Sequence, residues 1–307
     1  MKVLVTGGAG FIGSNLARAL LERGDEVRVL DNFSTGNRAN LAGLEVEIVE
    51  GELRSYERVH NATRGVEVVY HLGALGSVPR SVQDPLTSSA VNVEGTLNVL
   101  LAARDEGIRR VVFSSSSSVY GSRTDLPVDE SMPSDPISPY GVAKLAAERY
   151  CVSFSRVYES FETVVLRYFN VFGPRQSPFS QYAAMVPLFI TAVARGEPVT
   201  IFGDGEQSRD FTYVENVVDA TLSASEAEGA SGRIFNVAAG SPASVNAVAD
   251  AIGRILGKPV ERRHGPPRPG DIRDSWADVS EAERVLGYRP SIDLEEGLRR
   301  TIESLGV

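Results

Sequence analysis

The chain of 307 residues carries 40 acidic and 31 basic side chains, which gives a formal net charge of −9 and a pI near 5.1. This length allows a substantial core, whereas the acidic balance, without a lysine or arginine run, argues against binding to nucleic acid or to an anionic membrane. Because the chain starts directly in an apolar strand, lacks an apolar run of membrane-spanning length and has one cysteine, we expect a cytoplasmic protein without an intrachain disulfide.

A glycine-rich turn follows the first predicted strand. Residues 1–6 have the character of a short buried strand, and residues 14–23 have the apolar spacing of a helix that stops at Gly24. Between them lie glycines that, in this context, let the backbone approach a dinucleotide pyrophosphate at the helix N-terminus. The spacing is G-x-x-G-x-x-G rather than the G-x-G-x-x-G of many dehydrogenases. The predicted cofactor-binding residues of the turn are Gly7, Gly10, Phe11, Ile12 and Gly13.

An acidic residue ends the second predicted strand. Residues 26–30 form that strand, and Asp31 follows it, 18 residues after Gly13. A carboxylate in this place accepts hydrogen bonds from the ribose hydroxyls of the adenosine and repels a 2′-phosphate. The sequence therefore predicts NAD rather than NADP as the cofactor, with Asp31 and the adjacent Asn32 in the binding site.

Strands and helices alternate in the first half of the chain. Apolar segments at 46–49, 66–71, 110–115 and 163–168 indicate strands, and helical spacing covers 87–105 and 140–158. Such alternation is typical of a parallel sheet that helices cover on both faces. We therefore predict an α/β fold with a Rossmann-like, doubly wound parallel sheet.

The character of the chain changes after Phe169. Several turn-rich segments follow, and we expect a smaller α/β domain for the substrate in this part. Residues 233–237 nevertheless look like one more strand of the first domain. The predicted NAD-binding domain comprises 1–168 and about 209–240, and the predicted substrate domain comprises 169–208 and 241–307.

A tyrosine and a lysine four residues apart offer the chemistry. Ser138 and Pro139 are a suitable N-cap and first-turn pair, so Tyr140 opens a helix that carries Lys144 on the same face. A free tyrosine has a pKa of about 10, but a fixed ammonium and a nicotinamide cation favour its phenolate. A hydroxyl of the serine run at 114–118 can hold the same alcohol oxygen. These groups are suited to taking a proton from a sugar hydroxyl while its carbon gives up hydride.

Four segments together resemble the extended short-chain dehydrogenase/reductase family. They are residues 6–13, Asp31-Asn32, the serine-rich segment that ends in Val119-Tyr120-Gly121, and Tyr140-x-x-x-Lys144. Within that family the chain is most similar to the UDP-galactose 4-epimerases and to their relatives that act on UDP-N-acetylhexosamines and UDP-uronates. The resemblance covers nearly the whole chain and implies NAD as the cofactor and a UDP-sugar as the substrate.

The resemblance also implies roles for the catalytic residues. Ser116 aligns with the catalytic serine of the family, and Ser118 can share its work. Tyr140 as a phenolate removes the O4 proton while the C4 hydride passes to the nicotinamide, and Lys144 holds the nicotinamide ribose and keeps the pKa of the tyrosine low. The 4-keto sugar then rotates in the site and takes the hydride back on its other face. The expected enzyme is a UDP-hexose 4-epimerase.

Two other functions are possible on this fold. By resemblance, the dehydratases carry an Asp-Glu pair in place of Ser117-Ser118, and the decarboxylases carry a glutamate at position 118. Because elimination needs a positioned acid and base and these positions are hydroxyls, the sequence favours epimerisation. A dinucleotide-sensing regulator usually lacks the tyrosine or the lysine, and this chain has both.

Further residues match substrate-binding positions of the family. Asn170, Arg209 and Arg268 match groups that bind phosphate, for which arginine forks are suited. Ser275 stands where glucose- and galactose-restricted epimerases have a tyrosine, so it leaves room beside C2 for an acetamido group. Ala184 and residues 75–80 also resemble the N-acetylhexosamine branch. The predicted substrate-binding residues are Ser116, Ser117, Ser118, Asn170, Ala184, Arg209, Arg268 and Ser275.

A UDP-glucuronate 4-epimerase remains an alternative. Some uronate epimerases have threonine at position 170 and a second arginine at position 177, where this chain has asparagine and serine. Arg80 can face a carboxylate or point outward, and the residues alone leave both open.

The remaining expectations concern metals and assembly. The three histidines do not form a metal-ligand pattern, so we expect no metal and consider His71 structural or near the cofactor. Cys151 is expected to be a packing residue of helix 140–158. Family members commonly pair through helices that correspond to 87–105 and 140–158, so the resemblance implies a homodimer.

Overall fold

The computed structural model describes residues 1–177, 185–267 and 272–307. A seven-stranded sheet forms its larger part, with the strand order β11-β6-β5-β4-β1-β2-β3 and all neighbours parallel. The strands are β1 (Lys2–Thr6), β2 (Glu26–Asp31), β3 (Glu47–Glu50), β4 (Val68–His71), β5 (Arg110–Ser116), β6 (Glu162–Tyr168) and β11 (Arg233–Val237). The predicted Rossmann-like fold is confirmed, and the strand expected at 233–237 joins the sheet beside β6.

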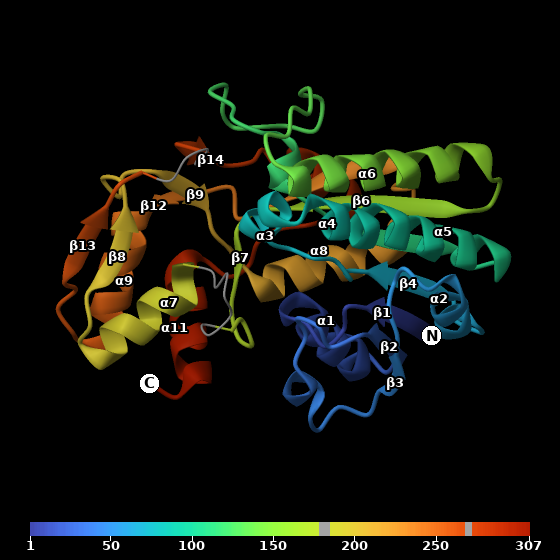
Figure 1. Cartoon of the computed structure of the whole chain (residues 1–307), viewed down its shortest axis with the longest axis horizontal. Helices are drawn as coiled ribbons and strands as arrows, with labels where there is room; N and C mark the ends of the chain where they lie inside the picture. The colour runs from blue at the N-terminus through green and yellow to red at the C-terminus, as the bar shows by residue number, and fades with distance from the viewer. Residues whose placement is uncertain (178–184, 268–271) are drawn as a thin grey trace.

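Helices cover both faces of this sheet because successive strand residues point to opposite sides. Val3 and Val5 of β1 pack in one apolar cluster with Leu16 and Val217, whereas Leu4 packs in another with Val99. The first cluster contains α1 and α8, and the second contains α2, α5 and α6 (Figure 1). These helices are α1 (Phe11–Glu22), α2 (Tyr56–Thr63), α5 (Gly95–Asp105), α6 (Pro139–Val157) and α8 (Val214–Glu226).

The helix expected at 87–105 is interrupted. It consists of α4 (Pro85–Ser89), a π-helical turn at Ala90–Glu94 and α5, and α3 (Val78–Gln83) precedes it. The wide turn carries the buried Asn92, whose amide accepts from the backbone N–H of Leu75 at 2.8 Å and donates to the Leu75 carbonyl at 3.1 Å. The wider turn accompanies this exchange of hydrogen bonds with the loop after β4, and such turns are common at functional sites. The helix expected at 140–158 is α6, within one residue at each end.

The rest of the chain builds three small sheets and four helices among the described residues, and most of these elements lie beside the large sheet, on the left in Figure 1. The helices are α7 (Met185–Arg195), α9 (Val245–Leu256), α10 (Ser280–Leu286) and α11 (Leu294–Leu305). The paired strands are β7 (Val171–Phe172) with β10 (Thr212–Tyr213), β8 (Val199–Phe202) with β13 (Arg262–Gly265), and β9 (Ser208–Asp210) between β12 (Pro242–Ser244) and β14 (Asp274–Ser275). The exact division into two domains stays a prediction.

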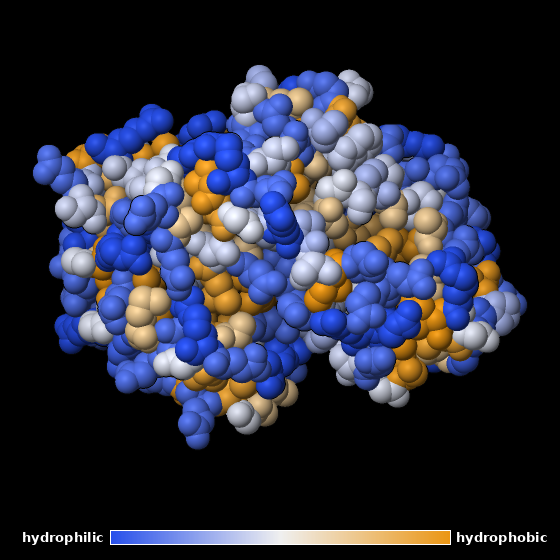
Figure 2. Space-filling view, turned by 180° about the vertical axis from the view of Figure 1, so that it is seen from behind, coloured by the Kyte–Doolittle hydropathy of each residue, from blue (hydrophilic) through white to orange (hydrophobic). Residues whose placement is uncertain are grey.

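The surface is mostly polar. Seen from behind, hydrophilic residues cover most of the molecule, and apolar residues form separate patches among them (Figure 2). Among the residues that the structure describes, no helix combines the length and the apolar character needed to cross a membrane.

Candidate active site

The glycine turn folds back on itself so closely that side chains would not fit. Gly7 has φ +68°, and a Cβ atom there would lie 2.7 Å from the Cα atom of Gly73. A Cβ atom on Gly13 would lie 2.3 Å from the Gly7 carbonyl oxygen. Helix α1 starts at Phe11 with Gly10 as an N-cap that brings no side chain, so the positive end of the helix faces the turn. The turn therefore has the shape and polarity that a diphosphate requires.

The crevice at this turn is the switch point of the sheet. From β1 the chain proceeds to β2 and β3 on one side, and then crosses to β4 on the other side. In open parallel sheets, ligands bind beyond the carboxyl ends of the strands at such a point. The serine-rich end of β5 lies at the same edge, with only β4 between it and β1.

Asp31 is buried at the end of β2, and its carboxylate organises the turn. Its Oδ2 accepts from the backbone N–H of Ala9 at 2.9 Å, and its Oδ1 accepts from that of Phe33 at 2.8 Å. Asp31 thus joins the glycine turn to the loop after β2, a structural role that its position in the sequence did not reveal. The neighbouring Asn32 is exposed, and its Oδ1 accepts from the Ser34 N–H at 3.0 Å.

The proposed catalytic serine meets the tyrosine through the packing of two chain segments. Ser138 caps α6 by accepting from the Gly141 N–H at 3.1 Å, as predicted. A Cβ atom on Gly141 would lie 2.7 Å from the Ser118 carbonyl oxygen, so the first turn of α6 rests on the turn Ser117–Val119. Ser116, at the end of β5, lies near enough to Tyr140 to lower its pKa, and its hydroxyl donates to the Ser118 Oγ at 3.1 Å.

Lys144 lies one turn further along α6, buried against β5. Its Nζ donates to the Ser114 carbonyl at 2.8 Å and lies 4.8 Å from the centroid of the Phe113 ring. Burial lowers the pKa of Lys144 to about 8, although Cys151 and Glu148 raise it. The predicted common face of α6 therefore carries both side chains to the end of β5.

The lowered pKa expected for Tyr140 depends on Lys144 together with the nicotinamide cation, so it stays a prediction. In the protein alone, burial raises the pKa of Tyr140, and the Ser116 hydroxyl opposes this shift. The physical reason is that loss of water around a phenol penalises its charged form. Within the protein alone, Tyr140 therefore holds its proton at neutral pH.

Ser81 is a site residue that the sequence analysis missed. This buried side chain of α3 accepts from the backbone N–H of Tyr140 at 3.0 Å and donates to the Val78 carbonyl at 2.7 Å. It satisfies an N–H group in the first turn of α6 that has no partner within the helix. No sequence pattern connects residues 59 positions apart, so only the fold reveals this contact.

His71 is buried at the end of β4 and is neutral. Its Nε2 donates to Thr96 Oγ1 at 3.0 Å, because the Thr96 hydroxyl already donates to the Asn92 carbonyl. Its Nδ1 then accepts from Thr6 Oγ1 at 2.7 Å. Burial, and after it the charge of Lys144, lowers the pKa of His71 to about 3. The expected structural role agrees with these contacts.

His71 should make the protein less stable below about pH 6.5. The folded protein keeps His71 neutral down to about pH 3, whereas a histidine in the unfolded chain binds a proton near pH 6.5. The unfolded state binds more protons in this window, so the free energy of unfolding should fall by about 1.4 kcal/mol between about pH 7.5 and 5.5. Urea unfolding of the wild type and of His71→Gln measures this component, which the variant should lack. His264→Gln, at an exposed position, should retain it, and equal pH dependence in all three proteins would contradict the assignment.

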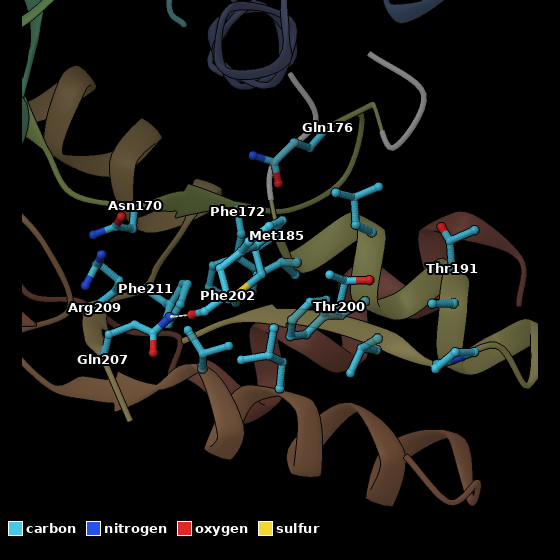
Figure 3. Close-up of a pocket in the computed structure, with 18 of the residues that line it drawn as sticks. Asn170, Phe172, Gln176, Met185, Thr191, Thr200, Phe202, Gln207, Arg209 and Phe211 are labelled. Atoms are coloured by element: carbon cyan, nitrogen blue, oxygen red, sulfur yellow. Dashed lines mark hydrogen bonds between the residues drawn. The ribbon is translucent and has the colours of Figure 1, made fainter. Parts of the chain in front are cut away.

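A cavity of about 730 Å³ lies between β7, α7, β8 and β9. Asn170 and Arg209 lie next to each other at one end, and Gln207 donates from Nε2 to the Phe202 carbonyl at 2.8 Å (Figure 3). Asn170 has φ +31°, a conformation that asparagine tolerates better than most residues. The Arg209 guanidinium donates to the Ser208 carbonyl at 2.7 Å and to the Arg273 carbonyl at 3.1 Å, which holds it at this end.

Ser275 lies beside this end of the cavity. In the pairing of β14 with β9, Ser275 is the register partner of Arg209. The fold therefore brings together three of the predicted substrate-binding residues, namely Asn170, Arg209 and Ser275. Ala184 and Arg268 lie outside the described residues.

Asp210 is a second residue that the sequence analysis missed. Its buried carboxylate accepts from the backbone N–H groups of Ala239 at 2.8 Å, Gly240 at 3.1 Å and Ala277 at 3.3 Å. Burial raises the pKa of Asp210, and these hydrogen bonds oppose the shift. Asp210 thereby connects β9, which carries Arg209, to the end of β11 and to the segment after Ser275.

Cys151 is buried in α6, as expected, and burial raises the pKa of its thiol. Within residues 1–177, 185–267 and 272–307, no three histidine, cysteine, aspartate or glutamate side chains form a group that could hold a metal ion. The described part of the site therefore combines hydroxyl, amide, ammonium and guanidinium groups with the carboxylate of Asp31 at the glycine turn.

Comparison with known proteins identifies the family. Residues 3–238 match the NAD dependent epimerase/dehydratase family. The chain belongs to this family. Its sequence is 40% identical over 313 residues to the UDP-glucose 4-epimerase of Mycolicibacterium smegmatis, a match that covers 99% of this chain and 98% of the relative.

Solved structures agree with this epimerase/dehydratase assignment. The UDP-glucose 4-epimerase of Thermotoga maritima with UDP-glucose superposes with a TM-score of 0.95 at 39% identity, covering 100% of this chain and 99% of that one. The UDP-N-acetylglucosamine 4-epimerase of Methanobrevibacter ruminantium in complex with UDP-N-acetylmuramic acid has a TM-score of 0.94 at 38% identity, with 99% and 97% covered. The predicted membership of the extended short-chain dehydrogenase/reductase family is confirmed.

NAD is the cofactor of this epimerase/dehydratase family member. The glycine turn fits this cofactor. Cβ atoms on Gly7 and Gly13 would collide with backbone atoms, so only glycines allow the tight turn that a dinucleotide diphosphate needs. Asp31 is at the end of β2, where a carboxylate accepts from ribose hydroxyls. The assignment of individual residues to NAD and to the substrate stays a prediction.

Proposed function

We propose that this enzyme is a UDP-hexose 4-epimerase, an isomerase that oxidises C4 of the sugar to a ketone and reduces it again on the opposite face. One observation carries the proposal. Tyr140 and Lys144 of α6 meet the serine-rich end of β5 at the sheet edge where the glycine turn of β1 also lies. This reaction requires a group that takes and returns the proton of an alcohol, and it requires a bound NAD beside that group.

The roles of the residues follow from their contacts. When bound, NAD supplies the ring that accepts hydride from C4 and returns it. Tyr140 takes the O4 proton as C4 is oxidised and gives it back on reduction, and Ser116 holds the same oxygen. The ammonium of Lys144 and a nearby cationic ring favour the phenolate, which offsets the effect of burial on the pKa of Tyr140. Gly7, Gly10, Phe11, Ile12 and Gly13 hold the diphosphate of the cofactor, and Asp31 and Asn32 its adenosine ribose.

Elimination is disfavoured by the side chains around the serine turn. Dehydration of a 4-keto sugar needs a base for a carbon-bound proton and an acid for the leaving hydroxyl. Ser117 and Ser118 provide hydroxyls, and Ser118 accepts a hydrogen bond from Ser116. The 4-keto sugar is therefore reduced again rather than dehydrated.

The cavity beside Asn170 and Arg209 is suited to the UDP group. An amide and a guanidinium at one end offer donors to a diphosphate, and apolar walls such as Phe202 and Phe211 line the same space. Arg268 is a further proposed phosphate ligand.

The sugar pocket has room for a substituent at C2. Ser275 is small and is the register partner of Arg209, which supports its proposed position beside C2 of the sugar. We infer that the enzyme accepts UDP-N-acetylglucosamine and UDP-N-acetylgalactosamine as well as UDP-glucose and UDP-galactose, and we keep Ala184 as a proposed substrate-binding residue. UDP-glucuronate is the second candidate substrate, and Arg80 is the residue that would face its carboxylate.

The experiment that tests this function uses purified protein without added cofactor. UDP-glucose, UDP-N-acetylglucosamine and UDP-glucuronate are incubated with it separately, and proton NMR follows the signals of the C4 epimers. We expect conversion of the first two to their galacto forms. A 4-keto-6-deoxy or pentose product would contradict epimerisation, and no conversion even with added NAD would favour a non-catalytic NAD-binding regulator.

We also propose that the enzyme is a homodimer, because apolar side chains of one face are exposed. Leu86 of α4 is 83% exposed, Val82 of α3 is 63% exposed, and Val142 and Tyr150 of α6 are 53% and 41% exposed. These three helices pack against one another and make a continuous face for a second copy. The predicted cytoplasmic location is not tested by these features.

Sedimentation should detect the dimer and its loss. We expect Leu86→Asp and Val142→Asp to shift the wild-type dimer toward monomer, because a buried unpaired charge opposes association. Ile48→Asp on β3 is the matched control, since Ile48 is also apolar and 43% exposed but lies on another element. A monomeric wild type, or variants that dimerise like it, would contradict the proposed interface.

A further inference from the structure

A fully buried ion pair lies behind the proposed catalytic residues. The side chains of Glu148 and Arg167 are 0% and 1% exposed. Arg167 donates from Nε to Glu148 Oε1 at 2.9 Å and from Nη2 to Oε2 at 2.8 Å, so both carboxylate oxygens are bound. Apolar side chains of similar volume often stabilise a core as well as a buried ion pair does. Stability alone therefore does not explain why two charges lie here.

The carboxylate of the pair connects three elements of the active site. Glu148 follows Lys144 by one helical turn on α6, and its Oε1 also accepts from Ser115 Oγ at 2.5 Å. Ser115 is the neighbour of Ser116 on β5 and the register partner of Arg167 on β6. One carboxylate is thus bonded to the strand that carries the catalytic serine and belongs to the helix that carries the tyrosine and the lysine.

The guanidinium extends the network to the segment that follows the serines. Its carbon lies 4.5 Å from the centroid of the Tyr120 ring, and its Nη2 donates to Ser134 Oγ at 3.2 Å. The Tyr120 hydroxyl in turn donates to Asn236 Oδ1 on β11 at 2.7 Å. The turn at Ser117–Val119 is therefore held between Ser115 and Tyr120, both of which contact the ion pair.

We propose that Glu148 and Arg167 are positioning residues, which hold α6, β5 and β6 together so that Ser116, Tyr140 and Lys144 meet. This role depends on the proposed function, because it concerns the same three side chains. Glu148 and Arg167 act through their neighbours and touch neither substrate nor cofactor.

The carboxylate has an electrostatic effect as well. The groups that face Lys144 are the Ser114 carbonyl and the Phe113 ring of β5, neutral His71 of β4, and Cys151 and Glu148 of α6. Glu148 raises the pKa of Lys144 against the effect of burial. Without that charge the pKa of Lys144 falls, and the ammonium is lost at a lower pH.

Two substitutions at position 148 in the full-length enzyme separate position from charge. Glu148→Gln should lower kcat by about 10- to 100-fold, as expected for a displaced reacting group, change KM much less, and move the alkaline limb of the pH–kcat profile to lower pH. Glu148→Asp keeps the charge but shortens the side chain, so it should lower kcat while the alkaline limb stays in place. A crystal structure of Glu148→Gln should show that the 2.8 Å contact between Lys144 and the Ser114 carbonyl is altered.

The matched control is an Arg–Glu pair at the opposite ends of the same two strands. Arg110 of β5 donates to Glu162 of β6 at 2.7 Å, and the two are register partners. Glu162→Gln should lower the thermal midpoint but leave kcat and its pH profile unchanged. If Glu148→Gln does not fold, Ser115→Ala removes only the hydroxyl link to β5 and should still lower kcat more than KM changes.

The outcomes distinguish this role from the proposed function. An active wild type together with wild-type kcat and pH profile in Glu148→Gln, or in Ser115→Ala when the first variant does not fold, would overturn the positioning role alone. A wild type that converts no UDP-hexose would contradict the proposed function, and the positioning role with it.

Discussion

Tyr140→Phe should lower kcat for UDP-hexose epimerisation by about 10³-fold, the usual range for loss of a general acid–base group. Phenylalanine keeps the ring but removes the hydroxyl that lies near Ser116. Because the hydroxyl takes part in proton transfer, we expect the KM for the substrate and the retention of NAD to change little. Proton NMR of the epimer ratio over time measures kcat, and absorbance of the released nucleotide measures bound NAD.

The control for this variant is on the same helix. Tyr150→Phe removes a tyrosine hydroxyl from α6 at a position that is 41% exposed. It should retain wild-type kcat. Substantial epimerisation by Tyr140→Phe would show that another group transfers the proton, and Ser116 would then be the first candidate.

Gly13→Ala should weaken NAD binding by about 100-fold or more and lower the free energy of unfolding by about 2–3 kcal/mol, because overpacking forces the backbone apart. The new Cβ atom would lie 2.3 Å from the Gly7 carbonyl oxygen and 2.8 Å from the Gly8 Cα atom, and both are backbone atoms that cannot rotate away. Opening this turn changes the path of the chain around the proposed diphosphate site. Calorimetric titration with NAD and urea unfolding measure the two effects.

Gly10→Ala is the comparison for stability. Gly10 has φ −76°, which any residue adopts, and a Cβ atom there would approach only the Gly7 carbonyl oxygen, at 3.1 Å. We expect a change of less than about 1 kcal/mol in the free energy of unfolding. Unchanged stability and NAD affinity in Gly13→Ala would mean that the turn is not held as the structure shows.

Local features were predictable because their causes are local. The alternation of apolar strands and amphipathic helices predicted the parallel sheet, and Ser138 predicted the start of α6 because an N-cap acts within three residues. The four-residue spacing of Tyr140 and Lys144 predicted their common face because helix geometry determines it. The spacing of Gly7 and Gly13 predicted a tight turn because glycine has no side chain and lets the backbone fold closely.

The site as a whole depends on contacts between distant segments. Ser81 supports the backbone of Tyr140, Asp31 supports that of Ala9, and the Glu148–Arg167 pair supports Ser115, each across residues that no periodic pattern relates. The sequence shows the charge of Lys144 beside Tyr140, but the burial that raises the pKa of Tyr140 in the protein alone depends on the folded chain.

The amino-acid sequence alone was thus enough for the fold class and for NAD as the cofactor, and it proposed the reacting groups, because each of these inferences depends on residue type and short-range spacing. The folded chain was needed to bring Ser116 to Tyr140, to place Ser275 beside Arg209 and to set the pKa values of Lys144 and His71. Those properties depend on burial and on partners far away in the chain, and burial exists only once the strands and helices have packed.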